Sequence, residues 1–137
     1  MSYILSIETA TKSCSIALAK DEQLIDCFEE VSEKYSHSEQ LTVFIQDILA
    51  KHHLSTKDLE AIAISSGPGS YTGLRIGVST AKGLCYALDI PLISISTLEA
   101  MAQLMVEDYP DFILCPMIDA RRMEVYCAFF GKQQSPV

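Results

Sequence analysis

The sequence is poor in positive charge. Ten lysine and arginine residues stand against eighteen acidic ones, which gives a formal net charge of −8 and a pI near 4.7. An acidic surface repels phosphate backbones, so we expect no unaided binding of nucleic acid, and any role with RNA would need a basic partner. No apolar run approaches the length of a membrane span, and the first eight residues lack a basic leader, so we expect a cytoplasmic protein without membrane association.

Several catalytic and metal-binding motifs are also missing. The three histidines include no pair spaced four residues apart and no H-E-x-x-H, so we expect neither a histidine-bound metal nor a metalloprotease centre. The cysteines are odd in number and contain no C-x-x-C pair, and their apolar or strand-like context predicts reduced core residues. They are Cys14, Cys27, Cys85, Cys115 and Cys127.

The most informative segment runs from Ser66 to Gly77 and reads SGPGSYTGLRIG. Its glycines lie between a short apolar run and a helical pattern, which predicts a strand-to-helix elbow whose backbone takes positive φ or approaches another segment closely. A Walker A loop needs a lysine that is not in register, and the third glycine comes one residue late for a dinucleotide fingerprint. A dinucleotide site is therefore a weak alternative, and a simple tight turn that lets a helix pack closely is another.

The apolar periodicity predicts an α/β succession. Runs of β-forming residues at 3–8, 14–19 and 24–30 predict an antiparallel meander. A capping-box spacing at Ser36 to Glu39 opens a helix expected over 37–53. Alternating strands and helices are then expected at 61–65, 71–88, 91–95 and 97–107, followed by a strand pair, 112–118 with 123–130, around residues 119–122. We expect one domain over 1–107 and the start of a truncated second domain over 108–137.

This order of elements resembles the ribonuclease-H-like half of the actin, sugar-kinase and Hsp70 superfamily. The resemblance implies an actin-like ATPase N-terminal domain of ββαβαβα plan, with a mixed five-stranded sheet of order 3-2-1-4-5 and the opening hairpin of a second like domain. Within the superfamily, the elbow resembles the signature of the TsaB (YeaZ) family of tRNA threonylcarbamoyladenosine synthesis. IETAT at 7–11, HSEQL at 37–41 and MIDARRMEVY at 117–126 also resemble that family at matching positions.

The resemblance implies a non-catalytic scaffold and no cofactor, in an inactive relative of the glycoprotease branch. Such a subunit binds TsaD and supports recruitment of TsaE, for transfer to the adenosine next to the anticodon of ANN-reading tRNAs. In isolation it would form a homodimer, and it would meet tRNA only through the complex. Two alternatives remain open: an actin-like nucleotide-binding phosphotransferase, and a homodimer that only stores the subunit.

Two candidate sites surround the elbow. In ATP-using relatives the first hairpin carries an acid, a glycine and a hydroxyl residue that grip phosphate and metal. Here Glu8, Thr9 and Thr11 form that turn, and the longer acid and missing glycine predict a degenerate phosphate turn. The elbow itself comprises the family-motif residues Gly67, Pro68, Gly69, Ser70, Tyr71, Thr72, Gly73 and Arg75. Arg75 lies in the first turn of a helix, where a cation is disfavoured, so we expect a carboxylate or carbonyl partner for it.

A third candidate site is a helix face. Small residues at helical spacing within 71–88 let another helix come close. The resemblance implies pairing through the first two helices, with partner-interface candidates Leu41, Ile45, Gly73, Ile76, Gly77, Thr80 and Leu84. The alternative is that this stripe meets only the chain's own first helix.

Overall fold

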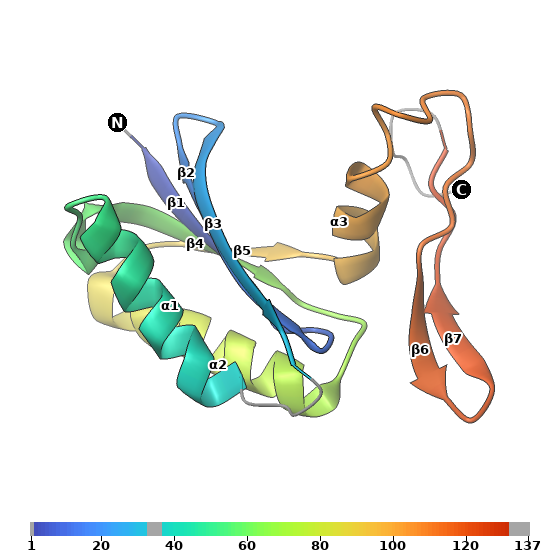
Figure 1. Ribbon diagram of the computed structural model, residues 1–137, viewed down its shortest axis with the longest axis horizontal. Coiled ribbons are helices and arrows are strands. Elements are labelled where there is room, and N and C mark those ends of the chain that lie inside the picture. Colours follow the sequence, from blue (N-terminus) through green and yellow to red (C-terminus); the bar gives the residue numbers. More distant parts are fainter. Residues whose placement is uncertain (1, 33–36, 132–137) are drawn as a thin grey trace.

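The computed structural model describes residues 2–32 and 37–131, which form a five-stranded mixed sheet, three α-helices and a separate two-stranded hairpin (Figure 1). The strands of the large sheet are β1 (Tyr3–Glu8), β2 (Ser13–Lys20), β3 (Gln23–Val31), β4 (Leu59–Ser65) and β5 (Leu92–Ile95). The helices are α1 (His37–Lys51), α2 (Tyr71–Leu88) and α3 (Thr97–Gln103), and the hairpin strands are β6 (Met117–Arg121) and β7 (Glu124–Cys127). A short 3-10 helix, η1 (Thr56–Asp58), leads into β4.

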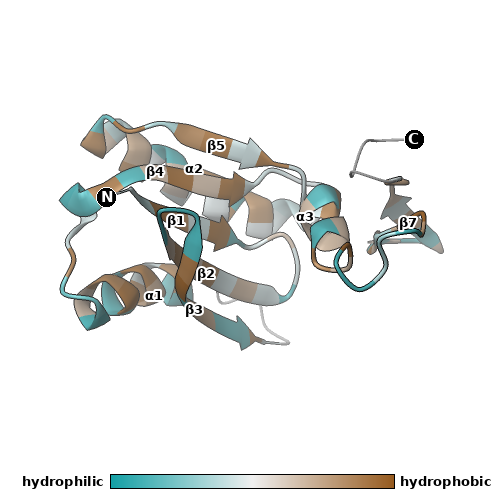
Figure 2. Cartoon of the chain, turned by 90° about the horizontal axis from the view of Figure 1, so that it is seen from above, coloured by the Kyte–Doolittle hydropathy of each residue, from teal (hydrophilic) through white to brown (hydrophobic). Residues whose placement is uncertain are grey.

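The large sheet has the order β3-β2-β1-β4-β5, which can be followed across Figure 2. β1 pairs antiparallel with β2, and β2 pairs antiparallel with β3, so the predicted meander is confirmed. β4 and β5 add parallel to β1 on the other side, and their connections contain helices, as parallel pairing requires. The order 3-2-1-4-5 and the mixed sheet of the actin-like, ribonuclease-H-like fold are therefore confirmed.

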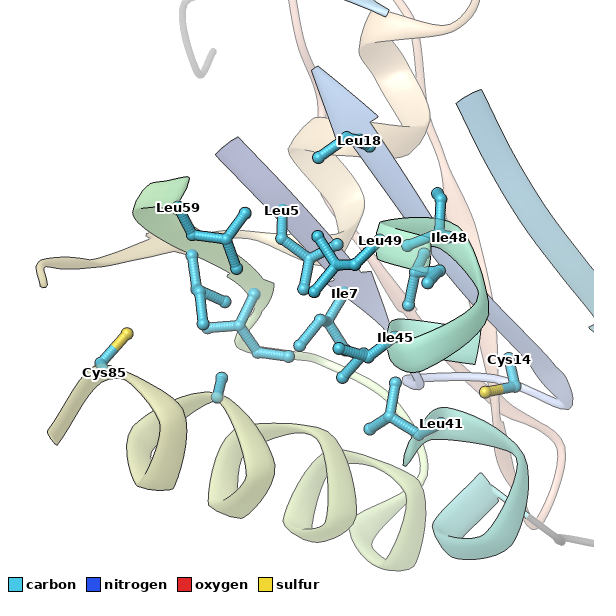
Figure 3. Packing of buried hydrophobic residues seen from close by; sticks show 14 residues of the cluster. Leu5, Ile7, Cys14, Leu18, Leu41, Ile45, Ile48, Leu49, Leu59 and Cys85 are labelled. Atoms are coloured by element: carbon cyan, nitrogen blue, oxygen red, sulfur yellow. The ribbon is translucent and has the colours of Figure 1, made fainter. Parts of the chain in front are cut away.

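The main core lies between the sheet and the pair α1 and α2 (Figure 3). Alternation along β1 and β2 turns every second side chain toward the helices, so Leu5, Ile16 and Leu18 are almost wholly buried. Leu41 and Ile48 of α1 reach the same cluster and have no exposed surface. Because these apolar side chains leave water on folding, this cluster provides most of the driving force for the α/β layer.

Polar contacts tie the edge strand β3 to α1. Asp26 accepts from Lys51 Nζ at 2.7 Å and lies 2.8 Å from His52 Nε2. These bonds, that from Lys51 foremost, lower the pKa of Asp26 to about 2. Phe28 packs edge-on against Phe44, with ring centroids 6.1 Å apart. The histidine at the end of α1 therefore has a structural partner, in line with its position at a helix terminus.

Two helices end earlier than the periodicity predicts. α1 stops at Lys51 instead of residue 53, because His53 takes a φ of +55° and the chain closes in a tight turn. In that turn Leu54 N donates to Leu49 O at 2.9 Å. α3 stops at Gln103 instead of residue 107, and the following residues form turns. No helix in the described parts of the chain is long and apolar enough to cross a membrane.

The final strand pair differs most from the prediction. The strands are shorter than 112–118 and 123–130, and the turn falls at Arg122 and Met123, because β6 continues through Arg121. Arg122 and Met123 both have positive φ, as a two-residue hairpin turn requires, although neither residue type favours that geometry. The hairpin forms its own two-stranded sheet, and the proposed domain boundary near residue 107 stays a prediction.

The expectation that every cysteine is a core residue is wrong for three of them. Cys14 and Cys85 are buried, and burial raises the pKa of each thiol. Cys27 and Cys127 are exposed, and Cys115 is half-buried. The exposed thiols lie on the edge strand β3 and on the hairpin, where only one face of the strand is covered.

Candidate functional site

The elbow between β4 and α2 is held at its outer side by the connection from β5 to α3. Gly67 has a φ of +113°, and the Gly67–Pro68 peptide is cis. Thr97 N donates to Gly67 O and Ser66 N donates to Ile95 O, each at 2.9 Å. The predicted strand-to-helix elbow with a glycine at positive φ is thereby confirmed.

The inner side of the elbow lies directly on the turn between β1 and β2. Ser70 N donates to Ala10 O at 2.6 Å. A Cβ on Gly69 would lie 2.5 Å from Ala10 O and 2.7 Å from Ala10 Cβ, so only glycine fits at this point. Ser70 also caps α2, since its Oγ accepts from Gly73 N at 3.2 Å. The close approach expected from the glycines is made to the candidate phosphate turn.

The start of α2 packs on the same turn through Thr9. Thr9 is wholly buried, and its Oγ1 donates to Gly73 O at 2.7 Å. A Cβ on Gly77 would collide with Thr9 Oγ1 and lie 3.1 Å from Ile64 Cδ1. Thr9 and Ile64 of β4 therefore leave no space for a side chain at Gly77, while Gly73 meets Thr9 through its carbonyl oxygen.

Glu8 closes the turn from within. Its Oε1 accepts from Ala10 N at 2.6 Å, and its Oε2 accepts a short hydrogen bond from Ser65 Oγ. Further along the turn, Ser13 N donates to Thr11 Oγ1 at 3.3 Å. The backbone donor at Ala10 and the hydroxyl of Thr9, which in a phosphate turn would face the ligand, are both used inside the protein.

A hollow of about 600 Å³ opens beside this turn on the sheet face away from α1 and α2. Its polar lining includes the carboxylates of Glu8 and Glu29, and its apolar lining includes Met101 and Leu104 of α3. None of the described residues that line it is lysine or arginine, so its charge disfavours a phosphate group. In the described ranges no three histidine, cysteine, aspartate or glutamate side chains gather as metal ligands would.

The predicted partner-interface residues divide into two groups. Leu41, Ile45, Gly73 and Gly77 are buried inside the chain, so they cannot contact a partner in this conformation, and this part of the expectation needs correction. The cause is packing, since α1 turns its leucine and isoleucine into the core and α2 turns its glycines toward Thr9 and β4. The half-buried residues Ile76, Thr80 and Leu84 still reach the surface of α2.

A shallow groove of about 440 Å³ runs along this surface. It is lined by Tyr71, Thr72, Arg75, Ile76, Ser79 and Thr80. Residues of the elbow and residues of the predicted interface thus line one groove on α2. The sequence pattern did not single out Ser79, which lies between the two sets. Arg75 is exposed, and no described residue pairs with its side chain, so the expected partner is not found in this part of the chain.

Sequence reasoning also missed Ser65 and Ala10. Ser65 ends the apolar run of β4 and is 7% exposed, and Ala10 is 1% exposed. A polar residue at the carboxyl end of a buried strand was the available signal for the serine. The role of Ala10 depends on its backbone carbonyl and N–H groups, which a pattern of side chains cannot reveal.

Comparison with known proteins gives a consistent result. A family model described as TsaD: tRNA N6-adenosine threonylcarbamoyltransferase matches residues 30–135. The tRNA threonylcarbamoyladenosine biosynthesis protein TsaB of Escherichia coli (strain K12) is 37% identical over 134 residues, which are 98% of this chain and 57% of that protein. The protein of the same name from Bacillus subtilis (strain 168) is 35% identical over 127 residues, 93% of this chain and 54% of that protein.

A solved structure agrees with both relatives. YeaZ from Pseudomonas aeruginosa matches with a TM-score of 0.88 at 30% identity, covering 100% of this chain and 64% of that one. The chain spans little more than half the length of the two curated relatives named above. It therefore belongs to the family that the model describes, TsaD: tRNA N6-adenosine threonylcarbamoyltransferase, and within it to the TsaB (YeaZ) group.

Proposed function

We propose that this chain serves as a non-catalytic subunit of tRNA threonylcarbamoyladenosine biosynthesis, the process named in its TsaB relatives. It pairs with a TsaD homologue and supports recruitment of a TsaE homologue, for transfer to the adenosine next to the anticodon of ANN-reading tRNAs. Its contribution is to hold the catalytic partner in a working conformation. Family membership supports the process, and the geometry of the first turn supports the non-catalytic role.

The observation that carries the non-catalytic role is the filled turn between β1 and β2. Glu8 accepts from Ala10 N and from Ser65 Oγ, so its carboxylate oxygens already have donors within the protein. The buried Thr9 Oγ1 donates to Gly73 O, and Ser70 N donates to Ala10 O. A phosphate would have to break several of these bonds, and the described residues that line the hollow beside them include no lysine or arginine to bind it.

The partner surface in this proposal is the groove face of α2. Ile76 and Thr80 are half-buried, and Tyr71, which lines the same groove, is 79% exposed. Leu84, also half-buried, follows Thr80 by four residues and extends this face along α2. An exposed aromatic residue next to small and aliphatic side chains is the composition that protein interfaces favour. The net charge of −8 favours a protein over tRNA as the direct contact.

The test is co-elution of the full-length protein with a TsaD homologue in size-exclusion chromatography. We expect a complex, and we expect Thr80→Arg to weaken it at least about tenfold, because a buried unpaired charge at an interface is costly. Gln103→Arg, which adds the same charge to an exposed position on α3, is the matched control and should bind normally. Failure of the unmodified protein to co-elute would contradict the proposal.

Two other outcomes would replace it. Micromolar ATP or ADP binding by calorimetry, abolished by Glu8→Ala, would favour the phosphotransferase alternative. Self-association tighter than pairing with the TsaD homologue would favour the storage homodimer. Thr80→Arg helps to recognise the storage homodimer, because in that case the variant should weaken self-association more than it weakens pairing with the TsaD homologue.

A further inference from the structure

The β6–β7 hairpin has two unlike faces. On one, Leu114, Ile118 and Phe130 pack against Leu98 and Ala102 of α3 in a small second core. Side chains alternate along each strand, so the positions between these residues point the other way. This second face is open: Met117, Val125 and Phe129 are each more than half exposed.

Cys115 and Cys127 share the open face. The strand register pairs Met117 with Cys127, and a bridge pairs Leu114 with Phe130. Cys115 is two residues before Met117 and is therefore the diagonal cross-strand neighbour of Cys127. The register is unbroken from the Leu114–Phe130 bridge to the Asp119–Val125 pair, so both thiols project from the same face of neighbouring chain segments. Cys127 is exposed and Cys115 is half-buried, so a reagent in solution reaches the pair.

We propose that Cys115 and Cys127 form an intrachain disulfide when the chain meets a low-molecular-weight disulfide of the oxidised glutathione class. The bond joins the two strands at the base of the hairpin. Disulfides require Cα atoms within about 7 Å of each other, and diagonal cross-strand neighbours lie about 7–8 Å apart, so the two segments need to approach by no more than about 1 Å. The other cysteines lack this arrangement: Cys14 and Cys85 are buried in the main core, and Cys27 lies opposite Ala17 on the large sheet.

The exchange proceeds in two steps. The thiolate of the exposed Cys127 attacks one sulfur of the small disulfide, a protein–small-molecule disulfide forms, and one small thiolate leaves. The thiolate of Cys115 then attacks the Cys127 sulfur and releases the second small thiol. The two protein thiols are oxidised, the small disulfide is reduced to two thiols, and the protons of the protein thiols pass to these through solvent.

The half-buried cysteine suits the second step. Burial, and then its neighbour Cys127, raise the pKa of the Cys115 thiol, and Cys115 is less accessible than Cys127, so the small disulfide meets Cys127 first. Its position beside Cys127 gives it an effective concentration on the order of millimolar or more. It therefore outcompetes free small thiol for the mixed disulfide.

The bond would lock the hairpin without disturbing its contact with α3. The sulfur atoms lie on the face opposite to Leu114, Ile118 and Phe130, so the small second core keeps its packing. Residues 115–127 would become a closed loop whose open conformations are restricted. Oxidation would thus slow protease cleavage near the exposed turn at Arg122 and Met123.

The test treats the full chain with oxidised glutathione at about pH 8.5, where thiolates form. We expect an intact mass lower by two hydrogens, and peptide mapping that links Cys115 to Cys127. Trypsin cleavage after Arg122 should be slower in the oxidised form and recover after reduction. Two separate glutathione adducts at Cys115 and Cys127, or a link found only between chains, would overturn the proposal.

Matched serine variants make the result specific. Cys115→Ser should abolish the link and leave Cys127 as a stable glutathione adduct. Cys27→Ser, which removes another exposed thiol, should leave the link unchanged. A bifunctional thiol reagent that bridges near neighbours gives an independent reading of the unmodified chain. It should join Cys115 to Cys127, and two singly modified cysteines in its place would count against the pairing.

Discussion

Two glycines on α2 should respond in opposite directions to the same substitution. Gly83 lies in the helix interior, and a Cβ there would meet nothing within 4 Å. Gly77 lies six residues earlier, and a Cβ there would collide with Thr9 Oγ1 and lie 3.1 Å from Ile64 Cδ1. Replacing either glycine by alanine brings the same gain in helix propensity, so the difference between the variants isolates the contact with Thr9.

The magnitudes follow from this contrast. Alanine in place of glycine in a helix interior stabilises by about 1 kcal/mol, which is the full effect expected for Gly83→Ala. In Gly77→Ala the gain is offset by overpacking of roughly 1–3 kcal/mol and by about 1 kcal/mol for the displaced hydrogen bond from Thr9 to Gly73. The variant should therefore lose about 1–3 kcal/mol net, and the two variants should differ by about 2–4 kcal/mol.

Urea denaturation followed by circular dichroism measures both values. The midpoint of Gly83→Ala should rise and that of Gly77→Ala should fall, with little change in slope, because the same surface is exposed on unfolding. In a Thr9→Ala background the cost of Gly77→Ala should shrink, since the colliding hydroxyl is gone. Equal stability of the two alanine variants would refute the packing of α2 on the first turn.

Three further outcomes are expected. Leu41→Ala should cost about 2–5 kcal/mol in urea denaturation, because Leu41 has no exposed surface, and should leave pairing with a TsaD homologue intact wherever the variant is folded. Hydrogen bonds lower the folded pKa of Asp26 to about 2, so its contribution to stability is present above its unfolded pKa of about 3.9 and is lost as pH falls toward 2; Asp26→Asn should flatten this part of a stability–pH curve. A thiol reagent should modify exposed Cys127 in the folded chain but buried Cys14 only in denaturant, as read by peptide mass.

Most element positions follow from local signals. β1 and α2 begin and end where alternation and helical periodicity place them, because half-buried strands and amphipathic helices impose their period on the residues. The elbow was equally clear, since closely spaced glycines at 67, 69 and 73 indicate a backbone that takes positive φ or approaches another segment closely. The end of α1 could not be predicted in this way, because His53 ends the helix with a positive φ that histidine does not usually adopt.

The sequence does not show which segment of the chain packs against each helix face. Gly77 indicates a close approach by another segment, and that segment contains Thr9, 68 residues earlier in the chain. Thr9 lies there because β1 pairs with β4. The stripe on α2 was expected to meet a helix, and instead its glycines meet the first turn of the chain. Periodicity gives the faces of a helix, and only the sheet decides which of them is covered.

The sequence by itself determined the α/β plan, the family and the elbow, because these rest on local period, on glycine's conformational freedom and on a motif of fixed spacing. Tertiary structure alone decided that Glu8 and Thr9 form their hydrogen bonds inside the protein, that Leu41 belongs to the core, and that Cys115 and Cys127 are cross-strand neighbours. The physical reason is that hydrogen bonds, burial and thiol contacts are set by residues distant in the chain, whose positions depend on strand pairing and layer packing as a whole.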